Sequence, residues 1–534
     1  MINFANLKLD KRTNSNNLDP FIGIRKNING EIEFRLPVGF DNFPEKDFNA
    51  IKQLFFRMYR TFKKFEQDNF NYLQQNEKST NKDNIEVGGN AYQFKDKEGN
   101  DVILYSKISV IERMLETYKD LALDVIERKI GRNENIDFSK IDQYLHKAIY
   151  LDDDVIYVDE MDLARQTLQH KSTNIIELFC FILFELQQEL EQTVEKRVNE
   201  LANKFREQHL THDQSLFNEE TFEITILYLK EILDEIDKQT IYKDDDYWQL
   251  YEAIETFLYG ELDMENTHEE GIFWGMSNFY QIWEDMCNTY AFKNFYNILY
   301  ADTNILFKGK PVANHSYGGH HIFVRENFEN PFFIEFLGNK RWMRPDCLHK
   351  ISIFDKNIKI IKEKTNSYSS LRCNFTVRLL NKNDKRICNK FIFNLKQALK
   401  RNKVRGARNK SNNEFVNYPI QLLNEQKDLI NKNLIILDWK YHDYNFFLSH
   451  SEKLKKDIIK QLSYEFALQQ KYKNPNRIQS QFVIPYFYPN EHNFKNNDDI
   501  GDFIEDCGDS LKNNEIQLFQ ANFIKLQQIY LSET

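Results

Sequence analysis

Two residues in the C-terminal half, Asp438 and Lys440, have the types and the spacing of a hydrolytic site. They follow the short apolar run at 434–437, which is typical of a buried strand. On a strand, residues i and i+2 point to the same face, so the carboxylate and the ammonium are expected side by side. Charged groups at the end of a buried strand are costly unless they have a function.

A second acid, Asp346, follows Arg344 and Pro345 and precedes an apolar segment that begins at Cys347. Two carboxylates can hold a hard divalent cation such as Mg²⁺, and a nearby lysine can orient or help deprotonate water. Metal-assisted hydrolysis of a phosphodiester needs this set of groups. The alternative is that Asp438 and Lys440 form a surface ion pair on an edge strand and that Pro345-Asp346 is a turn.

Hydrophobic periodicity predicts the elements that would position these residues. We expect a helix at 279–295, strands at 321–324, 347–354, 374–380 and 434–437, a helix at 457–469, and an apolar run at 482–488. Helices and strands in this mixture indicate an α/β or α+β core, within residues 266–534.

The first half of the chain shows two other patterns. Strand-like alternation at 21–24 and 31–36 and helical spacing at 48–71 and 108–127 predict a mixed α/β module over residues 1–130. Residues 131–265 are expected to be largely helical, with one long helix at 175–208 and shorter helices at 219–238 and 247–258. The whole chain is therefore predicted to be an α/β protein with a helical middle region.

Composition bounds the class of protein. The chain has 534 residues, of which 41% are hydrophobic and 28% charged, so it is long enough for several domains and too apolar to be disordered. It holds no run of 18 apolar residues, no secretory signal, no Cys-x-x-Cys among its six cysteines, and no phosphate-binding Gly-x₄-Gly-Lys-Ser/Thr loop. We expect a cytoplasmic protein that does not contact the membrane.

Charge is segregated along the chain. Residues 213–270 hold 18 acidic and 3 basic side chains, whereas residues 350–410 hold 18 basic and 3 acidic ones. Such asymmetry points to nucleic-acid or partner binding, although the net charge is −10. The densest basic stretch contains Lys400, Arg401, Lys403, Arg405, Arg408 and Lys410. It is predicted to contact DNA phosphates; a solvated surface loop is the alternative.

These motifs resemble those of the PD-(D/E)xK nuclease superfamily, and within it the McrC-like branch and the LlaJI-type restriction endonucleases. The resemblance rests on Pro345-Asp346, on the strand Leu-Asp-Trp-Lys-Tyr that contains Asp438 and Lys440, and on a following helix with Gln461 and Tyr464. A helix around Glu284 is similar to the opening helix of that family, and the run at 482–488 to a later strand. The match covers about residues 265–534.

The resemblance implies a restriction-endonuclease-like core and a DNA endonuclease of a prokaryotic restriction or anti-phage system. Glu284, Asp346 and Asp438 would be ligands of Mg²⁺ or Mn²⁺, Lys440 would position the water or stabilise the phosphate, and Gln461 and Tyr464 would brace the site or touch the scissile strand. A separate AAA+ GTPase or ATPase, similar to McrB, would act with it. The oligomeric state is left open between monomer and oligomer.

The sequence departs from the family in the spacing of Gln461 and Tyr464, which are separated by two residues where three are usual, so Lys460 is an alternative occupant of the glutamine position. Two other functions remain: a non-catalytic adaptor for DNA or an AAA+ partner on a decayed nuclease fold, and a TnsA-like transposition endonuclease. The acidic stretch at 213–270 is either a solvated surface or a docking face for a basic partner.

Two smaller motifs are weaker. The histidines His315, His320 and His321 are either a metal cluster or, more simply, a polar loop. His442 and Asp443 follow the candidate strand and either support the site or form a plain turn.

Overall fold

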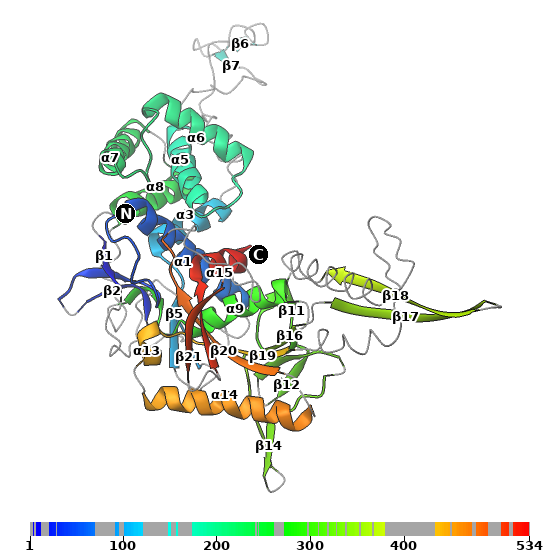
Figure 1. The fold of residues 1–534 in the computed structure, drawn as a ribbon. Helices are drawn as coiled ribbons and strands as arrows, with labels where there is room; N and C mark the ends of the chain where they lie inside the picture. The colour runs from blue at the N-terminus through cyan, green and yellow to red at the C-terminus, as the bar shows by residue number, and fades with distance from the viewer. Residues whose placement is uncertain are drawn as a thin grey trace.

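The computed structural model of the chain shows a mixed α/β protein in which two mixed sheets and a helical region pack together (Figure 1). It describes residues 4, 7–11, 21–27, 29–69, 91–95, 101–120, 148–150, 156–157, 173–240, 243, 245–260, 272–295, 298–307, 309–317, 320–326, 328–336, 339–351, 354–365, 368–379, 433–448, 451–472, 477–489, 504–511 and 516–532. None of the helices in this part of the chain has the length and apolar character that crossing a bilayer requires.

The N-terminal region is a six-stranded sheet covered by two helices. Its strands run in the order β1 (Lys8–Asp10), β3 (Ile32–Arg35), β2 (Ile22–Lys26), β8 (Ile272–Met276), β5 (Asp101–Tyr105) and β4 (Ala91–Lys95). The helices are α1 (Phe48–Asp68), which the Asp47 carboxylate caps by accepting from the amide of Ala50, and α3 (Ser109–Asp120). The two strands and the two helices that the periodicity predicts here are therefore present.

Strand β8 belongs to this sheet although it begins at Ile272, 167 positions after β5 ends at Tyr105. Its Gly275 pairs with Gly23 of β2, and both have left-handed φ angles, 141° and 134°. A Cβ on Gly23 would lie 2.1 Å from the carbonyl oxygen of Trp274, so only glycine permits this close approach. The chain thus returns to the N-terminal sheet immediately before it enters the C-terminal region.

The helical middle contains four helices: α5 (Thr173–Glu189), α6 (Lys196–His209), α7 (Phe222–Gln239) and α8 (Asp245–Tyr259). The prediction of one long helix at 175–208 is wrong, because the chain turns between α5 and α6, where Glu191 has a φ of 49°. Helix α5 is buried almost all round, whereas α6 buries one stripe, so the two segments have different packing partners.

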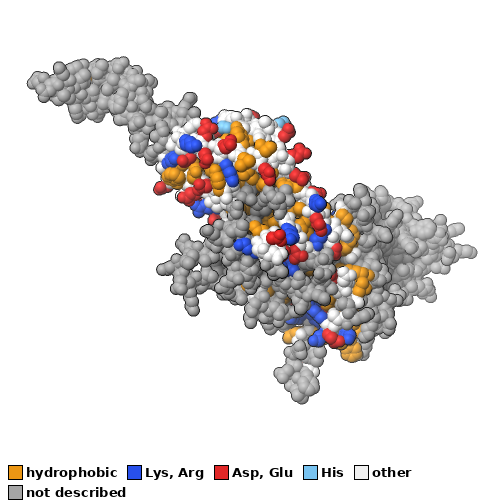
Figure 2. Space-filling view, turned by 90° about the vertical axis from the view of Figure 1, so that its left-hand side faces the viewer, with side chains coloured by type: hydrophobic (Ala, Val, Ile, Leu, Met, Phe, Trp, Pro, Cys, Tyr) orange, Lys and Arg blue, Asp and Glu red, His pale blue; other side chains and the backbone are white. Residues whose placement is uncertain are grey.

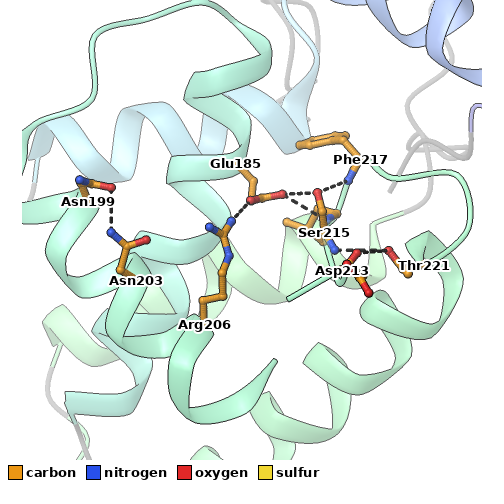
Figure 3. A network of polar contacts seen from close by, with 9 residues as sticks. Glu185, Asn199, Asn203, Arg206, Asp213, Ser215, Phe217 and Thr221 are labelled. Atoms are coloured by element: carbon orange, nitrogen blue, oxygen red, sulfur yellow. Dashed lines mark hydrogen bonds and ion pairs between the residues drawn. The ribbon is translucent and has the colours of Figure 1, made fainter. Parts of the chain in front are cut away.

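A polar network joins α5 to α6 and to the loop that follows α6 (Figure 3). The buried carboxylate of Glu185 accepts hydrogen bonds from the guanidinium of Arg206, the hydroxyl of Ser215 and, at 3.3 Å, the amide of Leu216. Each oxygen of this carboxylate therefore has a donor, which is the usual requirement for burying a charge.

The C-terminal region is an eight-stranded mixed sheet. Its order is β12 (His315–Tyr317), β13 (His320–Val324), β9 (Ile298–Asp302), β16 (Cys347–Ile351), β19 (Asn433–Trp439), β20 (Arg477–Tyr486), β22 (Ile516–Asn522) and β21 (Ile504–Leu511). The pairs from β12 to β19 are antiparallel, whereas β20 is parallel to both β19 and β22. The strands expected at 321–324 and 434–437 are confirmed, and the run at 482–488 lies mostly in β20. The strand expected at 347–354 is confirmed as β16 up to Ile351, whereas Phe354 already begins β17 (Phe354–Thr365) of another sheet.

Helices cover both faces of this sheet (Figure 1). On one face lie α9 (Tyr280–Asn294) and α15 (Phe523–Leu531), and on the other lies α14 (Glu452–Lys471), preceded by the short α13 (Tyr444–Leu448). Alternate residues of β19 face opposite ways: Ile435 and Leu437 join the core that contains α9, and Leu434 and Ile436 join Tyr464 of α14. Asp438 therefore faces α14.

Two hairpins extend from the sheet between β13 and β19: β14 (Phe333–Phe336) with β15 (Asn339–Trp342), and β17 (Phe354–Thr365) with β18 (Tyr368–Leu379). The strand expected at 374–380 lies in β18. The basic stretch at 400–410, with its six predicted DNA-contacting residues, lies outside the described residues. Short pairs β6 (Ile149–Tyr150) with β7 (Ile156–Tyr157) and β10 (Leu306–Phe307) with β11 (Lys310–Pro311) complete the strands.

The N-terminal and C-terminal regions share one hydrophobic core. Phe40 of the N-terminal region packs against Phe487 and Phe523, with ring centroids 5.0 Å apart in each pair. The amide of Val38 donates to the hydroxyl of Tyr441 at 3.0 Å, just beyond β19. The loop at 37–43 therefore buttresses the strand that carries the candidate site.

Candidate active site

The candidate site lies where β16 begins and β19 ends. These strands are antiparallel and pair Cys347 with Leu437, so Asp346 and Asp438 come together where the two neighbouring strands begin and end. The amide of Trp439 donates to Oδ2 of Asp346 at 2.7 Å, and a hydrogen bond links the two carboxyl groups. Asp438 is buried, and Asp346 is partly buried. The structure thus brings together the two acids that are 92 positions apart in the sequence.

Lys440 lies beside this pair, as the i and i+2 spacing predicts. Its Nζ is 3.1 Å from Oδ2 of Asp438 and 3.1 Å from Oδ1 of Asp457. The Lys440 side chain is 12% exposed, and its Nζ lies 5.5 Å from the centre of the Phe482 ring. The alternative of a surface ion pair on an edge strand is wrong, because β19 lies between β16 and β20 and buries both charges.

The pKa values of the two acids move in opposite directions. Loss of hydration, then the charge of Asp438 and then that of Glu284 raise the pKa of Asp346 well above its usual value. Burial would also raise the pKa of Asp438, but the ammonium groups of Lys440 and Lys460 and the hydrogen bond from Asp346 hold it lower. The surroundings therefore favour the protonated form at Asp346 and the ionised form at Asp438.

The Lys440 ammonium stays charged at this site. Burial lowers its pKa, but the carboxylates of Asp438 and Asp457 outweigh burial and raise it above the ordinary value. Lys440 can therefore donate hydrogen bonds and stabilise negative charge, whereas it cannot readily serve as a proton acceptor near neutral pH.

Gln461 and Tyr464 contact the backbone of the strands that carry the acids. The amide Nε2 of Gln461 approaches the carbonyl of Ile436 at 3.4 Å, and the hydroxyl of Tyr464 donates to the carbonyl of Arg344 at 2.9 Å. Both side chains are buried. Of the two roles predicted for them, these contacts favour bracing the site. The neighbouring Lys460 is exposed, and its positive charge acts on both Asp346 and Asp438.

Glu284 of α9 lies near enough for its charge to raise the pKa values of Asp346 and Cys287. Among the described residues, however, no three His, Cys, Asp or Glu side chains are arranged as a ready-made metal cluster. The two facing carboxyl groups are nevertheless suited to a hard divalent cation, because carboxylate oxygens are the ligands that such cations prefer. Asp346 and Asp438 therefore fit Mg²⁺ or Mn²⁺.

Three further residues at the site were not assigned a role from the sequence. Asp302 ends β9 beside Asp346, whose carbonyl accepts from the amide of Asp302 at 3.1 Å. Arg344 extends from the same edge: its Nη1 lies 2.5 Å from Nδ1 of His320 and 3.6 Å from Oδ2 of Asp302. Asp457 holds Lys440. The sequence could have indicated Asp302 as a site residue, because it follows a short apolar run, as Asp438 does.

The histidine motifs do not form metal sites in the part of the chain that the structure describes. His315 and His320 lie on the hairpin of β12 and β13, and His320 contacts Arg344. Asp443 caps α13 by accepting from the amide of Phe446 at 2.8 Å, so it is a turn residue. His442 stacks on the Phe446 ring; burial, with Lys453 and Lys440, lowers its pKa to about 3.

Comparison of the chain with protein-family models, with curated proteins and with solved structures finds no match.

Proposed function

We propose that the protein is a Mg²⁺-dependent DNA endonuclease of a prokaryotic restriction or anti-phage system. The observation that carries the proposal is that Asp346, Asp438 and Lys440 lie together at the ends of two interior strands, β16 and β19. Burying a carboxyl pair with opposite pKa shifts beside a charged lysine lowers the stability of the fold, so a purely structural role does not account for it. It matches the requirements of phosphodiester hydrolysis.

The order of elements also supports the proposal. Helix α9 is followed by the antiparallel strands β9, β16 and β19, then by α14 and by β20, which is parallel to β19. The helix around Glu284, the strand of Asp438, the helix of Gln461 and the strand after it thus occur in the order that the resemblance to PD-(D/E)xK nucleases implies.

In this proposal, Asp346 and Asp438 would hold the cation, with Glu284 of α9 as a third candidate ligand. When bound, Mg²⁺ supplies an activated water and neutralises charge on the phosphate. Both carboxylates would have to be ionised to act as ligands, so the affinity for the cation would fall as the pH falls. Lys440 orients the water and stabilises the negative charge that develops on the phosphate. Tyr464 and Gln461 keep the two strand ends in register.

The test of the proposal is nicking of supercoiled plasmid DNA by the purified full chain. Cleavage is expected with Mg²⁺ or Mn²⁺, much less cleavage with Ca²⁺, and none with EDTA. The same series is run with an AAA+ NTPase encoded beside the chain, because the proposal includes such a partner. Cleavage that persists in EDTA would exclude the metal-dependent mechanism.

The helical region offers a surface for that partner. On α7 and α8, Ile224, Leu227, Trp248 and Tyr259 are exposed, at 63%, 62%, 42% and 45%. Acidic side chains are frequent on these helices, but Lys230 lies over the Tyr259 ring at 4.4 Å and Lys243 over the Trp248 ring at 5.2 Å. Figure 2 accordingly shows hydrophobic, acidic and basic groups mixed over this region. Exposed apolar side chains among charges of both signs fit a partner surface that is likewise apolar and charged.

Replacement of Leu227 by Lys tests the partner surface. The variant should lose stimulation of cleavage by the AAA+ partner and keep the DNA affinity of the chain alone. A matched control is Lys196→Glu on α6, which is exposed and lies outside the α7–α8 patch. Equal stimulation of wild type and Leu227→Lys would place the partner elsewhere.

DNA would reach the site along the basic stretch at 400–410. Replacing Arg401, Lys403, Arg405 and Arg408 by Ala should reduce the salt dependence of DNA binding, by up to about four units of the log–log slope if all four contact phosphate. Residual cleavage should still require Mg²⁺. An unaltered slope would show that these residues do not contact DNA.

A further inference from the structure

The contact between Lys440 and Asp457 has no part in the reaction proposed above. Asp457 belongs to α14, whereas Asp438 belongs to β19, and the Lys440 ammonium lies between them at the same distance, 3.1 Å, from each carboxylate. Lys440 is thus shared between an acid at the candidate metal site and an acid outside it.

A divalent cation at Asp346 and Asp438 competes with Lys440 for the same charge. The ammonium contacts Oδ2 of Asp438, so a cation bound there would lie close to another positive group and repel it. Lys440 is only 12% exposed, so it cannot simply turn into bulk water. The Asp457 carboxylate, 17% exposed, is already within contact distance.

We propose that Asp457 is a positioning residue that takes over the Lys440 ammonium when a divalent cation binds at Asp346 and Asp438. The ammonium then turns from Asp438 to Asp457 and stays beside the site, where it can act on the water and the phosphate. The affinity for the cation therefore depends on Asp457 through Lys440. This inference rests on the proposed function, because it requires the cation site.

A different role for Asp457 would leave a different pattern. If Asp457 only added negative potential to the site, its loss would weaken cation binding whether or not Lys440 is charged. If it acts by receiving Lys440, its loss matters only while Lys440 is present. A double-mutant cycle on Asp457 and Lys440 separates these two cases.

The experiment is calorimetric titration of the full chain with Mn²⁺, without DNA, for wild type, Asp457→Asn, Lys440→Met and the double variant. Asp457→Asn should bind Mn²⁺ about tenfold more weakly than wild type, which corresponds to about 1.4 kcal/mol. Lys440→Met should bind as tightly as wild type or more tightly, and adding Asp457→Asn to it should change the affinity by less than about twofold.

Three further variants serve as a rescue, a substitute and a control. Asp457→Glu should restore most of the affinity, since it keeps an acceptor for Lys440. Asp457→Ser is the substitute if the Asn variant does not fold, as judged by thermal unfolding. Glu452→Gln, an exposed acid at the start of the same helix, is the control and should leave Mn²⁺ binding unchanged.

Two results would contradict the inference in distinguishable ways. If wild type binds Mn²⁺ and Asp457→Asn binds it equally well, or weakens it as much in the Lys440→Met background, the inference is wrong and the proposed function stands. If wild type binds no Mn²⁺ at all, the proposed cation site fails, and the inference fails with it.

Discussion

Glu66 in the N-terminal region and Asp346 in the C-terminal sheet are both acids with little access to water, but their surroundings differ. Glu66 accepts from the hydroxyls of Ser106 at 2.7 Å and Tyr92 at 2.9 Å, and Lys63 lies 3.4 Å away. Burial opposes ionisation, but the Ser106 hydrogen bond, Lys63 and Tyr92 outweigh it and lower the pKa of Glu66. Asp346 instead faces Asp438, and its pKa rises.

Glu185 in the helical region resembles Glu66, since a cation and neutral donors surround it. Glu66 and Glu185 therefore have donors for their carboxylates, whereas Asp346 and Asp438 face each other. Two acids placed together oppose stability, so the difference supports the proposal that the C-terminal pair serves the reaction. Substitutions in the two environments should consequently have opposite profiles: loss of activity at the site, and loss of stability elsewhere.

The largest effect is expected for Lys440→Met. Cleavage of DNA should fall by about 10³-fold, the middle of the range for a group that assists proton transfer or charge stabilisation. DNA affinity should change little, because Lys440 is mostly buried. Lys455→Met, an exposed lysine of α14, is the matched control. Equal cleavage rates for Lys440→Met and wild type at equal thermal stability would remove Lys440 from the mechanism.

Glu185→Ala should instead destabilise the fold, by about 2 kcal/mol, because it leaves Arg206 and Ser215 without their acceptor. This loss of stability is smaller than the loss expected on breaking a fully buried ion pair, because the Arg206 side chain is 32% exposed. Urea unfolding measures it, with the exposed Glu207→Ala as control. Cleavage at temperatures well below the midpoint should be retained. A stability equal to that of wild type would show that the network does not fasten the helices.

Glu66→Gln should cost about 1 kcal/mol at neutral pH and should change the pH dependence of stability. Because folding lowers the pKa of Glu66, its ionised form stabilises the protein above the unfolded pKa of 4.5, and this contribution is lost as the pH falls through the folded value. Wild type should therefore lose more stability than the variant below about pH 4.5. Urea unfolding at neutral and acidic pH checks this, and parallel curves would contradict it.

The smallest effect on stability is expected for Asp346→Asn. Burial and the Asp438 charge raise the pKa of Asp346 and so favour its uncharged form, which the amide of Asn resembles, and an Asn oxygen can accept from the Trp439 amide in the same way. The free energy of unfolding should change by less than about 0.5 kcal/mol, although cleavage should be lost. A destabilisation as large as that of Glu185→Ala would mean that the Asp346 carboxylate is a structural ion.

Much of the C-terminal region could be predicted from the sequence. The apolar run before Asp438 and the i, i+2 spacing of Lys440 are local patterns, and the structure places both side chains on one face of β19 as expected. The meeting of Asp346 and Asp438 depends on the pairing of β16 with β19, which no local pattern encodes; the motif, rather than periodicity, indicated it.

Other features lay outside the reach of local patterns. Asp302 and Asp457 join the site through strand order and through the packing of α14 on β19, which involve residues distant in sequence. The break between α5 and α6 was missed because apolar and charged segments both have helical spacing, and the turn at Glu191 carries no glycine or proline. Strand β8 was hidden because its sheet partners come from the first 105 residues.

The most direct test of the account is plasmid cleavage by wild type and Asp438→Asn, purified in parallel and compared with Mg²⁺ and the same AAA+ partner. Asp438 lies beside both Asp346 and Lys440, and the charges of Lys440 and Lys460 hold its pKa low against the effect of burial, so the account makes cleavage depend on it. Wild type is expected to nick the plasmid, and Asp438→Asn, at an equal unfolding temperature, is expected not to. Cleavage by both proteins at the same rate would contradict the assignment of this site as the nuclease centre.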